Sequence, residues 1–586
     1  MPALAFGANN KSLKLLTLGE RDKHYPKFGV IANEVAGLSE DRRCLVVILS
    51  GWIEHSKFTG ELAVEKLHQS YLGTSRSVAC IKNLTGEFCG VIIDYKNWNA
   101  YIVQDPLGIC RAYVGFAKGI VVVSNHLSEV YRPISTLEKL ELNRDYVRYF
   151  LADRQPGILT PFVNIQKVGY GMALCVDWNS MSLKQFPIWP PPPTDKLSGI
   201  DEEEILNELR FRMTQAVHRR LTNDKKKILI EASGGYDSSI VAFISQQINH
   251  DERLKHLLFG HYVYENKPSL SSISPRRKEI EKRLGSSKLH YYSMRRGWVL
   301  DGVPESLDDV LLSEEPTRVL AYYGRVIPYR KWLTSLGVEL LMGGWGGDEI
   351  FDWPPQLLLT LKSSFSIFAL VSEMYRWSVS RNWRMISLWR LIKKWEKEVS
   401  SPSVYEYPWL LEPVEEEGFY QLKLSRNYPV DVQFFMRRLY DVTSEISHPG
   451  WIPTVGQTFP YIDRDLIEFV IQLPTAMRMC PESPKALQKK AFSDIMPPRI
   501  AARVHKQHAG WQVAMGFANE IAREWKKSDS WIRGKNLVLG DLGLLDLKGY
   551  DQAIEMQLQG RESPQLEHVI TVWSMEIWLR KFYGLW

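Results

Sequence analysis

The sequence of 586 residues contains few cysteines, and they are scattered along the chain. None of the six lies in a Cys-X-X-Cys pair, so their spacing indicates neither a zinc site nor a disulfide framework. The chain also lacks a continuous apolar run of about 18 residues and an apolar segment at its N-terminus, so it predicts no membrane span and no signal peptide. We therefore expect a cytoplasmic protein in a reducing compartment.

The chain also lacks a large excess of charge of either sign. The chain has 73 Lys and Arg against 67 Asp and Glu, a net charge of +6, which suits an anionic ligand and does not require nucleic acid as a partner. A Gly-X-X-X-X-Gly-Lys phosphate loop is absent, which argues against transfer of a γ-phosphoryl group. Apolar residues make up 45% of the chain, enough for the cores of at least two domains.

The sequence does contain an apolar stretch, Ile228–Ile230, that continues into Glu231-Ala-Ser-Gly-Gly-Tyr-Asp-Ser-Ser239. This order predicts a strand, a sharp glycine turn and the start of a helix. Glycines let the backbone aim N–H groups at phosphate oxygens, and a helix N-terminus attracts anions. An ordinary Gly-Gly turn capped by Ser and Asp is the alternative. The residues expected at a bound phosphate group here are Ser233, Gly234, Gly235, Asp237, Ser238 and Ser239.

A strand that runs into Ser-Gly-Gly-X-Asp-Ser resembles the pyrophosphate loop of the ATP pyrophosphatases. Farther along, Gly343-Gly-Trp-Gly-Gly-Asp-Glu-Ile-Phe351 resembles the Gly-X-Gly-X-Asp-Glu-Leu-Phe segment of asparagine synthetases, as does Ser313-Glu-Glu-Pro316 before it. The resemblance implies ATP and Mg²⁺ as cofactors, with Asp237 and Asp348 as magnesium ligands that face each other across the pyrophosphate. Carboxylates suit this hard, oxygen-seeking ion, although a Gly-rich turn capped by Asp is the alternative. The glycines that the resemblance places at the phosphates are Gly344, Gly346 and Gly347.

Residues 1–186 consist of short β-branched runs separated by Gly, Asn and Asp turns, which predicts strands. Two of their segments, Leu84-Thr-Gly-Glu-Phe88 and Gln104-Asp-Pro-Leu-Gly108, resemble the glutaminase domain of class B asparagine synthetases. That domain is an αββα sandwich with a catalytic Cys at its mature N-terminus, whereas this sequence starts with Met1-Pro2. We therefore expect an inactive glutaminase-like domain, in which three residues at positions that hold glutamine in that family have a structural role. These positions are Gly86, Glu87 and Asp105.

Residues 187–200 include four consecutive prolines, which predict a stiff linker between two domains. Residues 201–586 then alternate predicted strands and helices, a pattern typical of a parallel, doubly wound sheet with its ligand at the carboxyl ends of the strands. The expected fold class is therefore α/β. It comprises an N-terminal αββα amidotransferase-like sandwich without its nucleophile, followed by a doubly wound ATP-pyrophosphatase synthetase domain with added helices.

The resemblance also suggests residues for the substrate side. Trp345 stands where asparagine synthetases commonly carry Glu and β-lactam synthetases carry Tyr. Because an indole cannot accept a proton, we interpret Trp345, together with Tyr440, as the wall of a larger pocket. Glu445 lies roughly where β-lactam synthetases place a catalytic Glu, and a simple surface Glu is the alternative. Arg503-Val-His-Lys506 resembles the segment before the family's catalytic Lys loop, so Lys506 would steady negative charge beside the adenylate. His508 is either a base near neutral pH or an ordinary loop histidine.

These resemblances imply adenylation of a carboxylate by MgATP, release of pyrophosphate and attack by an amine. Without a glutaminase, an intramolecular amine is the simplest nitrogen source, because tethering gives a high effective molarity. The chain length, an aromatic helical region and Trp345 favour the macrolactam synthetases that close lasso peptides. Their partners would be a precursor (core) peptide and a leader peptidase. The alternatives are a β-lactam synthetase-like cyclase, an ammonia-dependent asparagine synthetase and a non-catalytic peptide-binding scaffold.

Residues 376–397 interleave Trp with Arg and Lys in a helical pattern. Such a region can dock a peptide, a partner protein or a membrane surface. It can also be a core helix with a solvated basic face and long side-chain stems. The sequence leaves these interpretations open.

Overall fold

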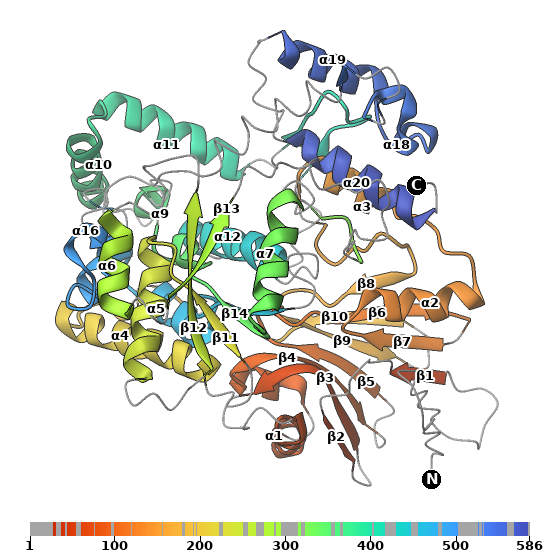
Figure 1. Ribbon diagram of the computed structural model, residues 1–586, viewed down its shortest axis with the longest axis horizontal. Coiled ribbons are helices and arrows are strands. Elements are labelled where there is room, and N and C mark those ends of the chain that lie inside the picture. The colour runs from red at the N-terminus through yellow and green to blue at the C-terminus, as the bar shows by residue number, and fades with distance from the viewer. Residues whose placement is uncertain are drawn as a thin grey trace.

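The computed structural model describes most of the chain between residues 27 and 583 (Figure 1). The described ranges are 27–30, 37–40, 44–53, 60–74, 77–94, 99–118, 120–154, 156–177, 182–190, 193–194, 196–221, 227–249, 256–264, 275–285, 289–294, 314–317, 323–352, 358–363, 367–400, 404–415, 429–446, 455–478, 483, 485–501, 525–526, 530, 532–559 and 568–583.

Two β-sheets form the N-terminal half of the molecule. The larger sheet has the strand order β10-β9-β5-β4-β3-β2, and the smaller sheet has the order β1-β7-β6-β8. Strand β1 pairs with β7 in parallel, and the other pairs are antiparallel. The strands are β1 (Lys27–Val30), β2 (Gly37–Glu40), β3 (Cys44–Ile53), β4 (Gly86–Asp94), β5 (Asn99–Gln104), β6 (Tyr113–Ala117), β7 (Ile120–Ser124), β8 (Ile165–Lys167), β9 (Met172–Asp177) and β10 (Ser182–Pro187).

Alternating side chains on these strands fill three cores. Val47 of β3 shares a core with Val121 of the other sheet, whereas its neighbour Ile48 packs in a second core with α1 (Gly60–Gly73). On the far side, Val122 of β7 packs with α2 (Leu127–Leu137) and α3 (Arg144–Leu151). Because successive strand residues point to opposite faces, this alternation stacks helix, sheet, sheet and helix in layers.

A five-stranded parallel sheet forms the centre of the second half, with the order β13-β12-β11-β14-β17. Strands β11, β12 and β13 follow one another outward, and the chain then returns to place β14 on the other side of β11. Where the strand order reverses in this way, an open parallel sheet leaves a crevice at the carboxyl ends of the two strands. The strands are β11 (Ile228–Glu231), β12 (Leu257–Tyr264), β13 (Leu289–Met294), β14 (Leu340–Met342) and β17 (Gly456–Thr458).

Helices cover both faces of this sheet (Figure 1). This cover explains why the central strand β11 begins with three buried apolar residues, 228–230. Ile228 and Ile230 of β11 pack in one core with α4 (Glu202–Leu221) and α5 (Tyr236–Ile248). Leu229, between them, packs in another core with Leu333 of α7 (Tyr323–Ser335). The predicted parallel sheet is confirmed by its strand pairing. The apolar residues along one face of α4 are all buried: Ile205, Leu209, Met213, Val217 and Leu221.

The end of the chain returns to the N-terminal half. Trp573 and Trp578 of the last helix, α20 (Val569–Phe582), share a core with Tyr146 of α3 and Phe162. Trp578 also donates a hydrogen bond to the carbonyl oxygen of Glu314. The two halves thus share a common core. The domain boundaries at residues 186 and 200 remain a prediction from the sequence.

Further helices surround the second half, and the Trp-rich region forms the pair α10 and α11. Trp377 and Leu388 lie in the small core of this pair, whereas Phe368 is 92% exposed. In the described part of the chain, no helix is long and apolar enough to cross a membrane. The remaining elements are η1 (Val78–Asn83), α6 (Pro275–Leu284), α8 (Gly347–Phe351), α9 (Leu358–Ser363), α10 (Ile367–Arg381), α11 (Met385–Ser400), β15 (Val404–Tyr405), β16 (Val414–Glu415), α12 (Val430–Ile446), α13 (Arg464–Gln472), α14 (Thr475–Arg478), α15 (Ala486–Ala491), α16 (Pro498–Ala501), η7 (Gly534–Asn536), α18 (Val538–Asp541) and α19 (Leu547–Leu558).

Candidate active site

The loop after β11 has the strand, turn and helix that its sequence predicts. Gly234 has a φ of 79°, which glycine adopts without strain, and α5 begins directly after Gly235. The hydroxyl oxygens of Ser233 and Ser238 lie 2.8 Å apart, and the hydroxyl of Ser239 donates to the carbonyl oxygen of Gly235 at 2.6 Å. These hydrogen bonds fix the loop at the N-terminus of a 13-residue helix, where an anion is favoured.

The loop after β14 packs directly against this first loop. A Cβ atom on Gly344 would lie 2.5 Å from the backbone nitrogen of Ser238, and one on Gly347 would lie 2.6 Å from the carboxyl carbon of Asp237. Gly346 has a φ of 90°, a conformation that a larger side chain would strain. The glycines are therefore required for the close approach of the two loops, which begin at the two strands where the sheet order reverses.

Asp237 and Asp348 converge on a single ammonium group. The Nζ atom of Lys485 lies 2.6 Å from Oδ1 of Asp348 and is also ion-paired with the carboxylate of Asp237. All three side chains are mostly buried, with exposed fractions of 18% for Asp237, 27% for Asp348 and 9% for Lys485. The sequence interpretation missed Lys485, which starts α15 in a left-handed conformation and belongs to no phosphate-binding motif.

Other elements hold these carboxylates in place. Gln488 of α15 donates to Oδ1 of Asp237 at 3.3 Å, and the hydroxyl of Tyr461 donates to the Asp237 carbonyl oxygen at 3.4 Å. Arg438 of α12 donates to the carbonyl oxygen of Asp348 at 3.0 Å. Burial raises the pKa of the neighbouring Glu349 above its ordinary value, although Arg438 and Lys485 oppose the shift. The site thus concentrates negative charge that a bound cation would offset.

The sequence model of the asparagine synthase family matches residues 208–580, well over half of the chain and a range that includes both loops and Lys485. The chain belongs to the asparagine synthase family. It is therefore an ATP-dependent carbon–nitrogen ligase of the asparagine synthetase type. Proteins of this family use ATP, typically together with Mg²⁺.

Comparisons with individual proteins add less. No curated protein matches the chain. Among solved structures, the chain is similar to glutamine phosphoribosylpyrophosphate amidotransferase from B. subtilis complexed with ADP and GMP, at 10% identity and a TM-score of 0.17. That match covers 44% of this chain and 72% of the other. A structure described as the allosteric regulatory enzyme of purine biosynthesis matches with the same identity, TM-score and share of this chain, and 62% of it is covered. Similarity at this level carries no argument about the site.

In this asparagine synthase family member, the carboxylates fit a magnesium ion. Asp237 and Asp348 supply only oxygen ligands, and both carboxylates already contact the same ammonium group, that of Lys485. These two residues would hold the ion, and the ion would polarise the phosphate oxygens of the nucleotide. Ser233, Ser238 and the glycines of both loops would contact the phosphates themselves.

The substrate side is described only in part. Trp345 is half-buried, with its ring centroid 6.4 Å from that of Phe459. Tyr440 is buried on α12, and its ring lies 4.9 Å from that of Tyr170 in the N-terminal half, so it sits at the contact between the halves. For Glu445 the structure places only the backbone, in the last turn of α12. Lys506 and His508 lie outside the described residues, and their assigned roles remain predictions.

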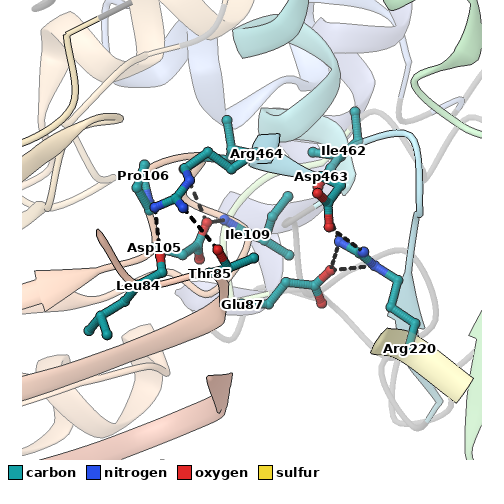
Figure 2. A pocket seen from close by; sticks show the side chains of 12 residues that line it. Leu84, Thr85, Glu87, Asp105, Pro106, Ile109, Arg220, Ile462, Asp463 and Arg464 are labelled. Atoms are coloured by element: carbon teal, nitrogen blue, oxygen red, sulfur yellow. Dashed lines mark hydrogen bonds and ion pairs between the residues drawn. The ribbon is translucent and has the colours of Figure 1, made fainter. Parts of the chain in front are cut away.

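The positions that would hold glutamine in a glutaminase line a small cavity between the halves (Figure 2). Its volume is about 10 Å³, room for about one water molecule. Oε1 of Glu87 accepts a hydrogen bond from Nε of Arg220 at 3.0 Å. Asp105 accepts three backbone N–H groups, and its burial raises its pKa to about 7. Both carboxyl groups are therefore engaged by the protein itself.

We predict that the purified protein does not hydrolyse glutamine. The carboxylate of Glu87 is bound to Arg220, and burial raises the pKa of the Cys89 thiol and raises that of Cys80 to about 11. A thiol with so high a pKa is a poor nucleophile near neutral pH. The measurement is glutamate release from glutamine, compared with a heat-killed sample. Release above that control would contradict the prediction.

Proposed function

We propose that this protein is a MgATP-dependent ligase that adenylates a carboxylate and closes a macrolactam within a peptide. The N-terminal amine of the peptide would attack an Asp or Glu side chain of the same chain, as in lasso peptide cyclases, with release of AMP and pyrophosphate. The observation that carries the activation step is the convergence of Asp237 and Asp348 on Lys485, where the sheet order reverses.

The residues of the site suit the chemistry of adenylation. A carboxylate oxygen is a poor leaving group, whereas AMP is a good one. Joining the carboxylate to the AMP part of ATP releases pyrophosphate. The backbone and hydroxyl donors of the loop after β11 would bind the departing pyrophosphate at the N-terminus of α5. Lys485 is already fixed between two carboxylates and would stabilise the charge that develops on the phosphate oxygens.

Two observations favour an amine supplied by the substrate itself. The carboxylate of Glu87 is bound to Arg220, which argues against glutamine as the nitrogen source. Trp345, in the second loop, is half-buried against the buried ring of Phe459, and its indole would suit a substrate larger and more apolar than aspartate. The core peptide and a leader peptidase would be the partners. A β-lactam synthetase-like small-molecule cyclase is the second candidate, because it too uses an intramolecular amine.

We expect Trp345→Glu to impair peptide cyclisation more than adenylation. The substitution places a charge against the aromatic surface of Phe459, which disturbs the acceptor side and leaves both aspartates intact. With a leader-free peptide, cyclisation should fall about tenfold while ATP–pyrophosphate exchange stays within about threefold of wild type.

Trp345→Phe is the matched control, since it keeps an aromatic ring at this position and should cyclise the peptide almost normally. Equal losses of exchange and cyclisation in Trp345→Glu would place Trp345 at the nucleotide instead. Unchanged or improved turnover with a small amino acid substrate would favour the second candidate.

A further inference from the structure

A buried ion pair network connects the cavity of Figure 2 to the synthetase half. Arg220 of α4 is only 3% exposed and lies between two carboxylates. Its Nη2 atom is 2.7 Å from Oε1 of Glu87 on β4, and its Nη1 atom is 2.9 Å from Oδ2 of Asp463. The hydroxyl of Thr458, at the end of β17, lies 3.1 Å from Glu87 and 2.9 Å from Nε of Arg220. One residue of the N-terminal half thus completes the pairing of an arginine in the other half.

The same arginine holds the segment that lies against the nucleotide loops. Its Nη2 atom donates to the carbonyl oxygen of Ile462 at 3.3 Å. Ile462 packs so closely on Gly346 that a Cβ atom there would lie 2.3 Å from its Cδ1 atom. The preceding residue, Tyr461, is hydrogen-bonded to Asp237 and to Gln488. Residues 458–463 therefore connect Arg220 to both aspartate loops.

Several further contacts restrict the position of residues 458–463. Asp463 also pairs with Arg219 at 3.0 Å and caps α13 by accepting the N–H of Asp465. Burial raises the pKa of Asp463, but Arg220 and Arg219 outweigh it, and the pKa ends below its ordinary value. Arg464 donates to the carbonyl oxygens of Lys82 and Leu84 in the N-terminal half, at 2.7 and 2.8 Å. Buried charged groups that are held by several hydrogen bonds keep a fixed geometry.

We propose that Glu87 is a positioning residue for the nucleotide site. Through Arg220 it fixes residues 458–463 against Gly346 and Asp237, so the N-terminal half helps to shape the nucleotide site. The inference rests on the proposed function, that this site binds MgATP and activates a carboxylate. The glutaminase-like half would then have a structural role, because the carboxylate of Glu87 is bound to Arg220 and not available to glutamine.

The test compares Glu87→Ala with Glu87→Gln in the full-length protein. Alanine removes the oxygen that Arg220 and Thr458 share, whereas glutamine keeps one acceptor there. We expect Glu87→Ala to raise the dissociation constant for MgATP, measured by calorimetry, about tenfold, within the range for residues that act through a packed network. The KM for MgATP in ATP–pyrophosphate exchange should rise in parallel, and Glu87→Gln should restore most of both.

Asp94→Asn is the matched control. Asp94 is a buried carboxylate at the other end of β4, hydrogen-bonded to Tyr71 of the same half at 2.8 Å, so its loss perturbs the same strand without touching Arg220. We expect it to leave MgATP affinity unchanged. Thr458→Val removes a hydroxyl of the same network from the synthetase half. It should also weaken MgATP binding, and it provides the test if Glu87→Ala does not fold.

Normal MgATP affinity and KM in Glu87→Ala would overturn the inference, as they would in Thr458→Val if the first variant is insoluble. An equal loss in Asp94→Asn would also overturn it, because the effect would then be general destabilisation of the N-terminal half. A wild-type protein that binds no MgATP would overturn the proposed function together with this inference, and that result is seen before any variant is compared.

Discussion

Asp237→Asn and Asp348→Asn should each reduce ATP–pyrophosphate exchange by about a hundredfold to a few thousandfold while the protein remains folded. Each substitution removes one of two charged oxygen ligands that converge in a mostly buried site. Loss of one partner from such a charge cluster costs about 3–5 kcal/mol, and each 1.4 kcal/mol is a factor of ten in rate. The measurement is the exchange of labelled pyrophosphate into ATP in the presence of the carboxylate substrate.

Asp352→Asn is the control for this pair, because Asp352 ends the same short helix that begins with Gly347. It changes the same functional group and should retain most of the exchange activity. Circular dichroism and melting temperatures would show that all three variants fold. Exchange within about threefold of wild type in either Asp237→Asn or Asp348→Asn would mean that the metal ion is held elsewhere.

Lys485→Met should lower kcat/KM for exchange by about a hundredfold. The ammonium group contacts both aspartates and is 9% exposed, so methionine fills the space but leaves two carboxylates facing each other without their cation. A loss of about 3 kcal/mol for a buried charge partner corresponds to this factor. Lys485→Arg should recover little, because a planar guanidinium does not replace a compact ammonium between two carboxylates.

Lys490→Met provides the comparison for Lys485→Met. Lys490 lies on the same helix, α15, but its side chain is 58% exposed and pairs with Glu202 at the surface. Removal of such an exposed pair has little effect, so exchange by this variant should match wild type. Similar losses in both lysine variants would show that α15, and not the ammonium of Lys485, is responsible.

Local sequence patterns predicted the two loops of the site that come directly after strands. The apolar run at 228–230 lies in β11 and the helix after Gly235 is α5, because the apolar run, the glycines and the serines all act within a few positions of one another. The alternation of strands and helices likewise predicted a parallel sheet. The glycines of the second loop were predicted to contact phosphate. The structure adds that Gly344 and Gly347 are also needed where the two loops touch.

Contacts between distant segments were not predictable in this way. Lys485 reaches Asp237 and Asp348 from a helix far along the chain, and no pattern around it indicates a partner. Glu315 belongs to a segment that resembles one near the family's second loop, yet it is buried in the N-terminal half. There it accepts hydrogen bonds from Tyr113 at 2.7 Å and Lys167 at 2.9 Å. Such pairings depend on how the two halves pack, which single-sequence patterns do not encode.

The central claim, that this protein activates a peptide carboxylate for an internal amine, is tested most directly by analysis of both products of one reaction. A leader-free peptide with an N-terminal Gly and an internal Asp or Glu is incubated with MgATP and the protein, and nucleotides and peptide masses are followed together. The account predicts AMP and pyrophosphate in step with a peptide that has lost one water molecule. Formation of ADP and phosphate, or of asparagine or a β-lactam without peptide-dependent AMP, would contradict it.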